Sequence, residues 1–299
     1  MNNREKVLHY IEGHFEHFLN LGNQNLNSED LPEQLFELTH LQKLDLFNNK
    51  LREIPATIEK LINLQVLNLS NNQLSRLPSS IGRLENLVEL NLSSNQLITL
   101  PLEIGSLRNL EELNLTGNLL TDLPESIGNM ENLKMLTLLS NQLEEVPKWI
   151  VNLKNLDCLK LGDNNITTLP HWLDRLENLK NIAFNGCNLK YVPEWIQHRT
   201  EIYFLALYKN DIKQIPKWLG KLGEIEILYL SENQLKEFPL VVTELTNLDE
   251  LDLAHNQISS IPRELNKLTN LRYLYLEGNP IKKLPGWLKE EMPDLVVEI

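Results

Sequence analysis

The 299-residue sequence lacks the features that would place it in a membrane, fibrous or disulfide-rich class. No apolar run approaches the ~20 residues that span a bilayer, and the polar start, from Met1 to Lys6, lacks the apolar stretch of a signal peptide. Gly and Pro number only 12 and 14, too few for a collagenous or low-complexity chain. Cys158 and Cys187 form no C-x-x-C pair, which favours free thiols in a reducing compartment. We therefore expect a folded cytoplasmic protein without membrane insertion; unconventional secretion is the alternative.

Basic residues are also scarce, because 28 Lys and Arg stand against 41 Asp and Glu, giving a net charge of −13. Such a chain repels phosphate backbones, so nucleic acid is not an expected partner. The motifs H-E-x-x-H, G-x-S-x-G and G-x-x-x-x-G-K-[ST] are missing, so we expect no catalytic activity and no cofactor. His14 and His17 lie three residues apart near Glu12 and Glu16, but a solvated helix face explains them better than a metal site.

What the sequence has in excess is leucine, at 65 residues, together with 36 asparagines. The pattern L-x-x-L-x-L-x-x-N-x-L begins at Leu41 and continues through a proline at Pro55 to the end of a 23-residue unit. Eleven such units follow one another without an insertion. The later units begin at Leu64, Leu87, Leu110, Leu133, Leu156, Leu179, Ile202, Ile225, Leu248 and Leu271.

This pattern resembles the signature of leucine-rich repeats, and the resemblance covers residues 41 to about 290. The unit length and the L/I-P-x-x-I/L-x-x-L segment are most similar to the Ras-group, plant intracellular and bacterial intracellular classes. The resemblance implies an α/β solenoid shaped as a curved right-handed horseshoe. Its parallel β-sheet would line the concave face, and short helical or 3-10 turns would cover the convex face.

The local sequence independently predicts the same coil. Leu44 and Leu46 alternate as in a short strand with one buried face, and Ile58 and Leu61 are spaced as in one helical or 3-10 turn. The asparagines that follow each strand can satisfy turn backbone as a stacked ladder. Cys187 stands at the asparagine position of the seventh unit, so we expect the ladder to be weaker there.

Because one coil cannot bury its own apolar faces, the two ends of the stack need caps. We expect one domain, in which residues 1–40 form an amphipathic capping helix plus an irregular first repeat with an insertion at 27–30. Residues 41–293 form the eleven regular repeats, and residues 294–299 form a capping strand. The apolar face of the helix is predicted from helical spacing at Val7, Leu8, Ile11, Phe15 and Phe18.

The tryptophans all occupy the same repeat position, two residues after the proline, and we expect them to lie half-exposed on the convex side. They are Trp149, Trp172, Trp195, Trp218 and Trp287. The first four are also the candidates for a convex interface. Filling of the gaps between adjacent outer turns is the preferred interpretation, so we expect a monomer.

The positions equivalent to 43, 45 and 47 alternate with the buried leucines and should point out from the concave face. Apart from Lys43, Phe47 and Val66, these positions are small, polar or acidic through the fourth repeat. Later repeats carry the candidate partner-binding residues, which are Met135, Leu139, Lys160, Phe204, Tyr208, Ile227, Tyr229, Tyr273 and Tyr275. Gly162, Ala183 and Ala206 suggest a shallow depression among them, with Glu250 and Asp252 as an acidic margin. Cross-strand packing for stability is the alternative explanation of the aromatic residues.

The sequence therefore predicts a non-catalytic scaffold that binds a protein or peptide on its concave face. Resemblance to Ras-group repeats implies a small GTPase or another signalling protein as one candidate partner. Two alternatives stay open. The chain is either a microbial effector or surface protein that engages a host protein, or the sensor part of a larger signalling enzyme.

Overall fold

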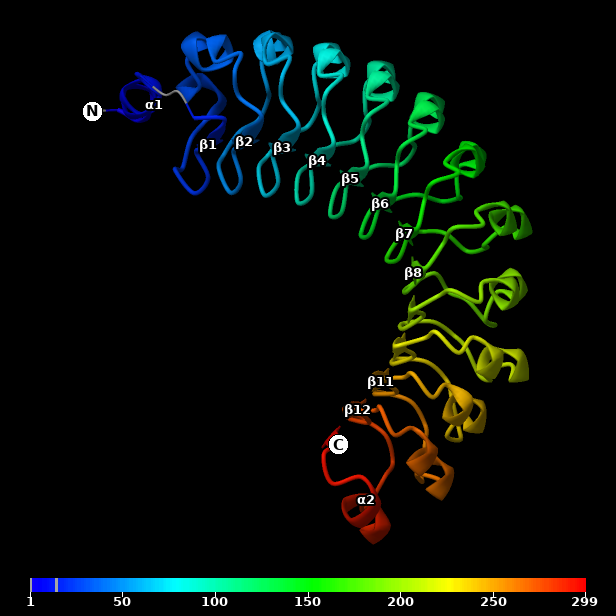
Figure 1. The fold of residues 1–299 in the computed structure, drawn as a ribbon. Helices are drawn as coiled ribbons and strands as arrows, with labels where there is room; N and C mark the ends of the chain where they lie inside the picture. Colours follow the sequence, from blue (N-terminus) through cyan, green and yellow to red (C-terminus); the bar gives the residue numbers. More distant parts are fainter. Residues whose placement is uncertain (1, 14–15) are drawn as a thin grey trace. The chain divides into compact units, whose positions relative to one another are not determined.

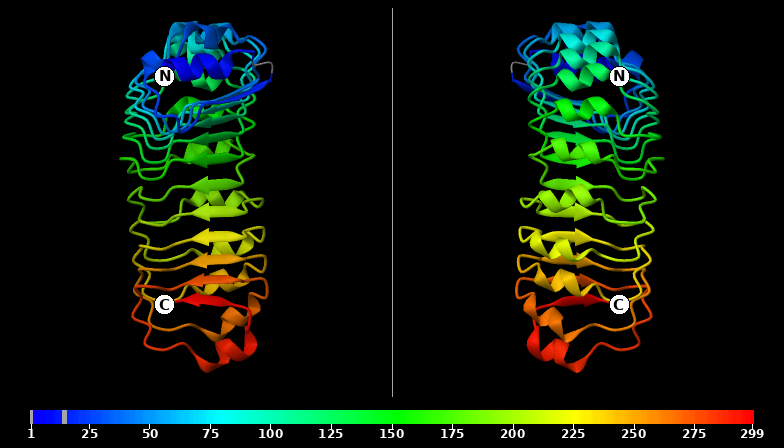
Figure 2. Two further views of the ribbon diagram at one scale, coloured as in Figure 1. Left: turned by 90° about the vertical axis from the view of Figure 1, so that its left-hand side faces the viewer. Right: turned by 90° about the vertical axis from the view of Figure 1, so that its right-hand side faces the viewer.

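The computed structural model describes residues 2–13 and 16–299, in which short parallel strands alternate with 3-10 helices (Figure 1). The chain forms two compact units, the first ending at Leu156 and the second beginning at Asp157. Within each unit the strands lie on one side and the 3-10 helices on the other, as Figure 2 also shows. Each coil thus contributes one strand to one face and one helical turn to the opposite face.

The first unit holds six of the strands, which pair in parallel and in chain order. They are β1 (Phe18–Asn20), β2 (Lys43–Asp45), β3 (Val66–Asn68), β4 (Glu89–Asn91), β5 (Glu112–Asn114) and β6 (Met135–Thr137). The helices are α1 (Asn3–Ile11) and the 3-10 helices η1 (Ser28–Asp30), η2 (Glu33–Glu37), η3 (Ala56–Lys60), η4 (Ser79–Arg83), η5 (Leu102–Ser106), η6 (Glu125–Asn129) and η7 (Lys148–Asn152).

The second unit continues the same scheme, again with parallel pairing in chain order. Its strands are β7 (Cys158–Lys160), β8 (Asn181–Ala183), β9 (Phe204–Ala206), β10 (Ile227–Tyr229), β11 (Glu250–Asp252), β12 (Tyr273–Tyr275) and β13 (Val296–Glu298). Its helices are η8 (His171–Arg175), η9 (Glu194–His198), η10 (Lys217–Lys221), η11 (Leu240–Glu244), η12 (Arg263–Lys267) and the α-helix α2 (Gly286–Glu291).

Strand register confirms the repeat length within each unit. Leu44 lies opposite Leu67, and each regular strand residue lies opposite the residue 23 positions further along. The first pair differs, because Leu19 lies opposite Leu44, 25 positions later. The first repeat therefore contains two extra residues, as the sequence predicts, and η1 forms at the predicted insertion.

Buried asparagines connect neighbouring coils, which confirms the predicted ladder. Asn72 Nδ2 donates to the carbonyl oxygens of Leu46 and Leu69, both at 3.0 Å, and Asn72 Oδ1 accepts from the Leu51 N–H at 3.1 Å. One side chain thus satisfies three buried backbone groups in two coils. The residue before it, Asn71, has a φ of 55°, in the left-handed region that asparagine tolerates.

The 3-10 helices form where the sequence predicts a helical turn. Pro55 begins η3 with a φ of −68°, and its carbonyl oxygen accepts from the Ile58 N–H at 3.1 Å. A second series of asparagines, which the sequence reasoning missed, lies just after these helices. Asn63 Nδ2, for example, donates to the Thr39 carbonyl oxygen of the preceding coil at 2.8 Å.

Helix α1 covers the first coil but is shorter than predicted. Val7 and Ile11 are buried, and Asn3 Nδ2 donates to the Asn25 carbonyl oxygen at 3.1 Å. The helix ends at Ile11, and Gly13 then adopts a φ of 71°, in the left-handed region that interrupts helical geometry. The prediction that Phe18 belongs to the helix is wrong, because Phe18 opens β1. Phe15 and His14 lie outside the described residues.

Candidate functional site

Each unit has an exposed sheet face, formed by the strand side chains that point away from the buried leucines. On β2, Leu44 is fully buried, whereas Lys43 is exposed and Asp45 half-buried. In the first unit this face is mainly polar, and side chains on it form hydrogen bonds with neighbouring groups of the same face. Asn68 Oδ1, for example, accepts from the N–H and the hydroxyl of Ser70, at 3.1 and 2.6 Å. Met135 and Leu139, at the end of this unit, are half-buried face residues.

The exposed sheet face of the second unit carries an aromatic patch, which we define as Phe204, Tyr208, Ile227 and Tyr229. All four side chains are half-buried. The rings of Phe204 and Tyr229 meet edge to face, with centroids 5.5 Å apart and planes at 85°. Ile227 lies opposite Phe204 in the β9–β10 register. The structure therefore brings together four of the predicted partner-binding residues on adjacent coils.

Two lysines border the aromatic patch. Lys160 Nζ lies 5.4 Å from the Phe204 ring centroid, and Lys209 Nζ lies 5.9 Å from that of Tyr208. Burial, with the nearby Asp163 and Glu232 carboxylates, raises the pKa of the Tyr208 hydroxyl. At neutral pH the patch is thus an uncharged aromatic surface with cations at its edge.

The depression expected near Gly162 is filled at that glycine by a neighbouring side chain. A Cβ atom on Gly162 would lie 2.1 Å from Asn185 Oδ1, and Asn185 itself is only 1% exposed. Asn185 Nδ2 donates to Asp163 Oδ2 at 2.8 Å, which holds the amide in place. Ala183 and Ala206 are buried beside it. Sequence reasoning named the small residues but missed Asn185, which fills the space that they leave.

A second surface feature lies on the same face, and we call it the tyrosine hollow. It has a volume of about 360 Å³, and tyrosines and carboxylates dominate its lining. The lining residues are Tyr229, Ser231, Glu232, Glu250, Asp252, Ala254, His255, Tyr275 and Glu277. The predicted residues Tyr229 and Tyr275 thus lie at one site, together with the acidic margin.

Hydrogen bonds fix the carboxylates of the tyrosine hollow. The Tyr229 hydroxyl donates to Glu250 Oε1 at 3.0 Å. Asp252 accepts from the Ser231 hydroxyl and, through Oδ1, from the Ala254 N–H at 2.9 Å. Burial first, and then Glu250, raise the pKa values of the Tyr229 and Tyr275 hydroxyls, so both tyrosines stay neutral at physiological pH.

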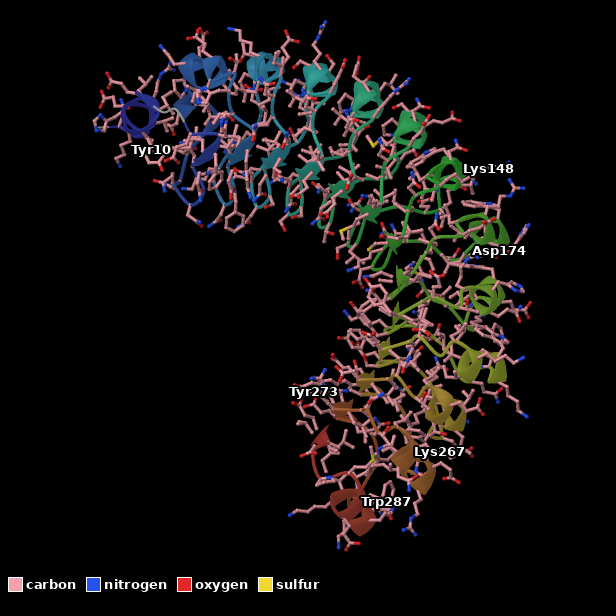
Figure 3. All side chains as sticks on the ribbon, in the orientation of Figure 1. Tyr10, Lys148, Asp174, Lys267, Tyr273 and Trp287 are labelled. Atoms are coloured by element: carbon pink, nitrogen blue, oxygen red, sulfur yellow. The ribbon has the colours of Figure 1, made fainter. Side chains whose placement is uncertain are left out.

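Tyr273 adds an exposed ring next to the tyrosine hollow. It is 40% exposed and lies opposite Glu250 in the β11–β12 register. Figure 3 shows Tyr273 projecting from the strand side, whereas Lys267 and Trp287 lie on the helical side of the same unit. The exposed sheet face of the second unit therefore carries aromatic side chains on β9, β10 and β12, with the acidic Glu250 and Asp252 on β11.

The tryptophans on the helical side only partly match their prediction. Trp172, Trp218 and Trp287 are half-buried, as expected. Trp149 and Trp195 are only 8% and 7% exposed, so the expectation that these two are half-exposed is wrong. Trp195 packs edge to face against the core residue Phe184, with centroids 6.1 Å apart. Trp195 thus packs against the core of its own repeat, and the filling of gaps between adjacent outer turns stays a prediction.

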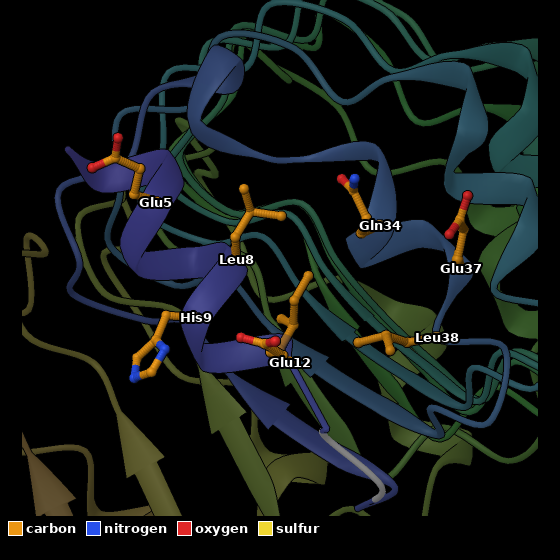
Figure 4. Close-up of a pocket in the computed structure, with 8 residues that line it drawn as sticks. Glu5, Leu8, His9, Glu12, Gln34, Glu37 and Leu38 are labelled. Atoms are coloured by element: carbon orange, nitrogen blue, oxygen red, sulfur yellow. The ribbon is translucent and has the colours of Figure 1, made fainter. Parts of the chain in front are cut away.

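Another hollow lies between α1 and η2 in the first unit, and Figure 4 shows the side chains that line it. Its volume is about 530 Å³, and Glu5, Leu8, Glu12 and Leu38 are among its lining residues. No trio of His, Cys, Asp or Glu positioned to hold a metal ion occurs among the described residues. None of the helices in residues 2–13 and 16–299 is long and apolar enough to cross a membrane.

Comparisons with known proteins agree with this architecture. Three segments match models of repeat families, described as a leucine-rich repeat region (residues 14–119), a leucine-rich repeat (109–130) and two copies of leucine-rich repeats (246–289). A leucine-rich-repeat protein of Leptospira interrogans has a similar solved structure, with 33% sequence identity and a TM-score of 0.71. The match covers 94% of this chain and 83% of that protein. Among curated proteins, none matches the chain.

Two other solved structures show the same fold. Internalin InlF of Listeria monocytogenes is 20% identical, with a TM-score of 0.72 and coverage of 94% of this chain and 86% of that one. The Arabidopsis receptor kinase HAESA, in complex with the peptide hormone IDA and a co-receptor, is 27% identical with a TM-score of 0.73. That match covers 89% of this chain, which spans about half, 49%, of the receptor chain.

Strands on one face, 3-10 helices on the other and a buried asparagine at most of the turns define a solenoid of leucine-rich repeats. The chain belongs to the leucine-rich-repeat family.

Proposed function

We propose that the chain is a non-catalytic interaction module that binds a protein or peptide on its exposed sheet face. The aromatic patch of the second unit is the proposed centre of contact. The observation that carries this proposal is that Phe204, Tyr208, Ile227 and Tyr229 stay half-buried on a surface whose fold does not need them. Aromatic side chains on an open surface are enriched at the energetic centres of interfaces.

Cross-strand packing accounts for only part of this patch. The edge-to-face contact between Phe204 and Tyr229 stabilises the pair, and such contacts contribute about 1 kcal/mol. Among the described residues, the Lys209 ammonium lies over the Tyr208 ring, and no edge-to-face ring contact is made by Tyr208. A half-buried tyrosine beside a cation is suited to contact a second molecule, because its ring offers apolar area and its hydroxyl a hydrogen bond.

Similar proteins support a peptide or protein as the ligand. HAESA, of which the chain matches about half, was solved with a peptide hormone. For this chain, a small GTPase or another signalling protein is the partner class that the resemblance to Ras-group repeats suggests. We take the cytoplasm as its proposed location, because both Cys158 and Cys187 are thiols, as expected in a reducing compartment.

Selection from a displayed library of random dodecapeptides tests the proposal directly. We expect peptides that bind the full chain and lose affinity when Tyr208→Ala is introduced. Truncation of an interface aromatic commonly costs at least about 2 kcal/mol, roughly a thirtyfold increase in Kd. The substitution should change the free energy of unfolding by less than about 1 kcal/mol, since Tyr208 is not in the core between coils. Fluorescence anisotropy and urea unfolding measure the two effects.

Tyr191→Ala is the matched control, because Tyr191 lies in the same unit but is 78% exposed and outside the exposed sheet face. Its affinity for the selected peptides should equal that of the unaltered chain. If the peptides discriminate against Tyr191→Ala and tolerate Tyr208→Ala, the binding site lies elsewhere and the aromatic patch is cross-strand packing.

A further inference from the structure

We infer that the tyrosine hollow receives a lysine or arginine side chain, so that the partner is a basic peptide segment. The inference rests on the proposed function and adds the chemistry of the ligand to it. It starts from the combination of aromatic rings, carboxylates and a concavity on one exposed sheet face. Tyr229 belongs to both the aromatic patch and the tyrosine hollow, so the two features are continuous.

The carboxylates give the tyrosine hollow a negative formal charge, and His255 is the one basic side chain among its described lining residues. Four carboxylates, those of Glu232, Glu250, Asp252 and Glu277, line it, and neither lysine nor arginine occurs among the described lining residues. The lysines near the aromatic patch lie over Phe204 and Tyr208 and are not among the described lining residues of the hollow. A cation that approaches the hollow is therefore attracted by several carboxylates at once.

Two of the carboxylates and the Tyr229 ring are oriented by hydrogen bonds within the hollow. Glu250 accepts from the Tyr229 hydroxyl, and Asp252 accepts from Ser231 and from the Ala254 N–H. Each carboxylate keeps a further lone pair for an incoming donor. Because the Tyr229 hydroxyl is used within the hollow, its ring presents only an aromatic surface. Preorganisation of this kind reduces the conformational entropy that is lost when a ligand binds.

An organic cation fits this lining better than a metal ion. No trio of His, Cys, Asp or Glu in the described part of the chain is arranged to hold a metal. Lysine and arginine carry an apolar stem below the charge, and Tyr229 and Tyr275 can cover that stem while the carboxylates meet the charge. Arginine also pairs with a carboxylate through two parallel hydrogen bonds.

The strand spacing sets where the basic residue falls in the peptide. Phe204 on β9 and Asp252 on β11 are two strand steps apart, which is about 10 Å. An extended peptide that crosses the strands rises about 3.3 Å per residue, so about three residues cover this distance. We therefore expect an apolar or aromatic residue about three positions from the lysine or arginine.

The dodecapeptide selection, repeated on two charge variants, tests this inference. Glu250→Gln with Asp252→Asn removes two charges while keeping the size of both side chains and an oxygen to accept from Tyr229 and Ala254. Glu264→Gln with Asp294→Asn makes the same charge change at exposed positions away from the sheet face. Peptides selected on the unaltered chain should be enriched in lysine and arginine. Exchange of the basic residue for glutamine should weaken binding about tenfold, as for a lost charged pair.

For the protein variant Glu250→Gln/Asp252→Asn, replacing the basic residue of the peptide by glutamine should change Kd less than about twofold. For the control variant Glu264→Gln/Asp294→Asn, the same peptide exchange should still raise Kd about tenfold. Selected peptides without basic enrichment, or discrimination that survives Glu250→Gln/Asp252→Asn, would overturn the inference. The proposed function would still stand in either case if Tyr208→Ala weakened those peptides. Peptides indifferent to Tyr208→Ala would instead contradict the proposed function itself.

Discussion

At the scale of single residues, the buried asparagines couple neighbouring coils most directly. Asn233 Nδ2 donates to the carbonyl oxygens of Leu207 and Leu230 at 2.9 and 3.1 Å, and Asn233 Oδ1 accepts from the Ile212 N–H at 2.9 Å. At the equivalent position Cys187 Sγ lies 3.8 Å from the Leu161 carbonyl oxygen and 3.5 Å from that of Asn185. A thiol is a weak donor and replaces only part of the amide.

We expect a reciprocal exchange at this position to move stability in opposite directions. Asn233→Cys leaves three buried backbone groups poorly satisfied and should lower the free energy of unfolding by about 3 kcal/mol. Cys187→Asn restores donors and an acceptor and should raise it by about 1 kcal/mol. Urea unfolding followed by circular dichroism measures both. Equal stability of Asn233→Cys and the unaltered chain would show that the asparagine ladder is not what holds the turns.

The thiol of Cys187 illustrates what sequence spacing can predict at this scale. Its place in the repeat already indicates a buried residue, and burial raises the pKa of this thiol to about 12. Arg199 shows the opposite case. It stands where other repeats have leucine and is 8% exposed, with its guanidinium 2.6 Å from Asp174 Oδ1. The pattern alone could not reveal it, because its partner lies 25 residues earlier on another coil.

At the scale of secondary structure, the strands and turns were predictable because each is encoded by a repeated local pattern. The length of the N-terminal helix was harder to predict. Its apolar spacing continues through Phe18, but the chain leaves the helix after Ile11, and a positive φ follows at Gly13. Phe18 then pairs with Lys43, and residues 18–20 form strand β1 instead of continuing the helix. Tertiary pairing thus overrides a helical period that the sequence alone presents.

The C-terminal strand β13 gives a prediction at this scale. Val296 N–H donates to the Arg272 carbonyl oxygen at 2.9 Å, and Leu276 N–H donates to that of Glu298 at 2.7 Å. Deletion of residues 295–299 removes these bonds and exposes the edge of β12. We expect a lower thermal midpoint, corresponding to a loss of about 2 kcal/mol in the free energy of unfolding.

Ile299→Ser is a suitable control for this deletion, since Ile299 lies just beyond the strand and is 59% exposed. Differential scanning calorimetry should show an unchanged midpoint for this variant. A truncated chain that melts like the full one would mean that the residues after Pro293 do not cap the second unit.

At the scale of the whole molecule, contacts in each unit are made chiefly between successive coils. The aromatic patch was predictable as a set of outward positions, because strand alternation assigns them. The tyrosine hollow was only partly predictable. Its concavity depends on how the side chains of Tyr229, Ser231 and His255 are placed around Asp252. These residues come from neighbouring coils, so the pattern of a single repeat does not predict their arrangement.

We expect the chain to be a monomer of 34.7 kDa, because our prediction assigns the tryptophans to filling the gaps between outer turns. Sedimentation velocity at increasing concentration should show a single species of that mass. Trp172→Ala with Trp218→Ala, which truncates two half-buried rings, should leave this behaviour unchanged. A dimer that dissociates in this folded variant would instead assign the tryptophans to a self-association surface.

The constant register of the strands has a consequence for how recognition can evolve. Phe204 lies directly between Asn181 and Ile227, so each face position has a fixed neighbour on either side. Under the proposed function, a point mutation there changes the ligand preference while the buried framework persists. Gain or loss of one coil between β9 and β11 would move the aromatic patch relative to the acidic residues by one strand step, about 4.8 Å. Under the proposed function, point mutations therefore change the choice of partner in small increments, whereas duplication or loss of a whole coil changes it in steps of one strand spacing.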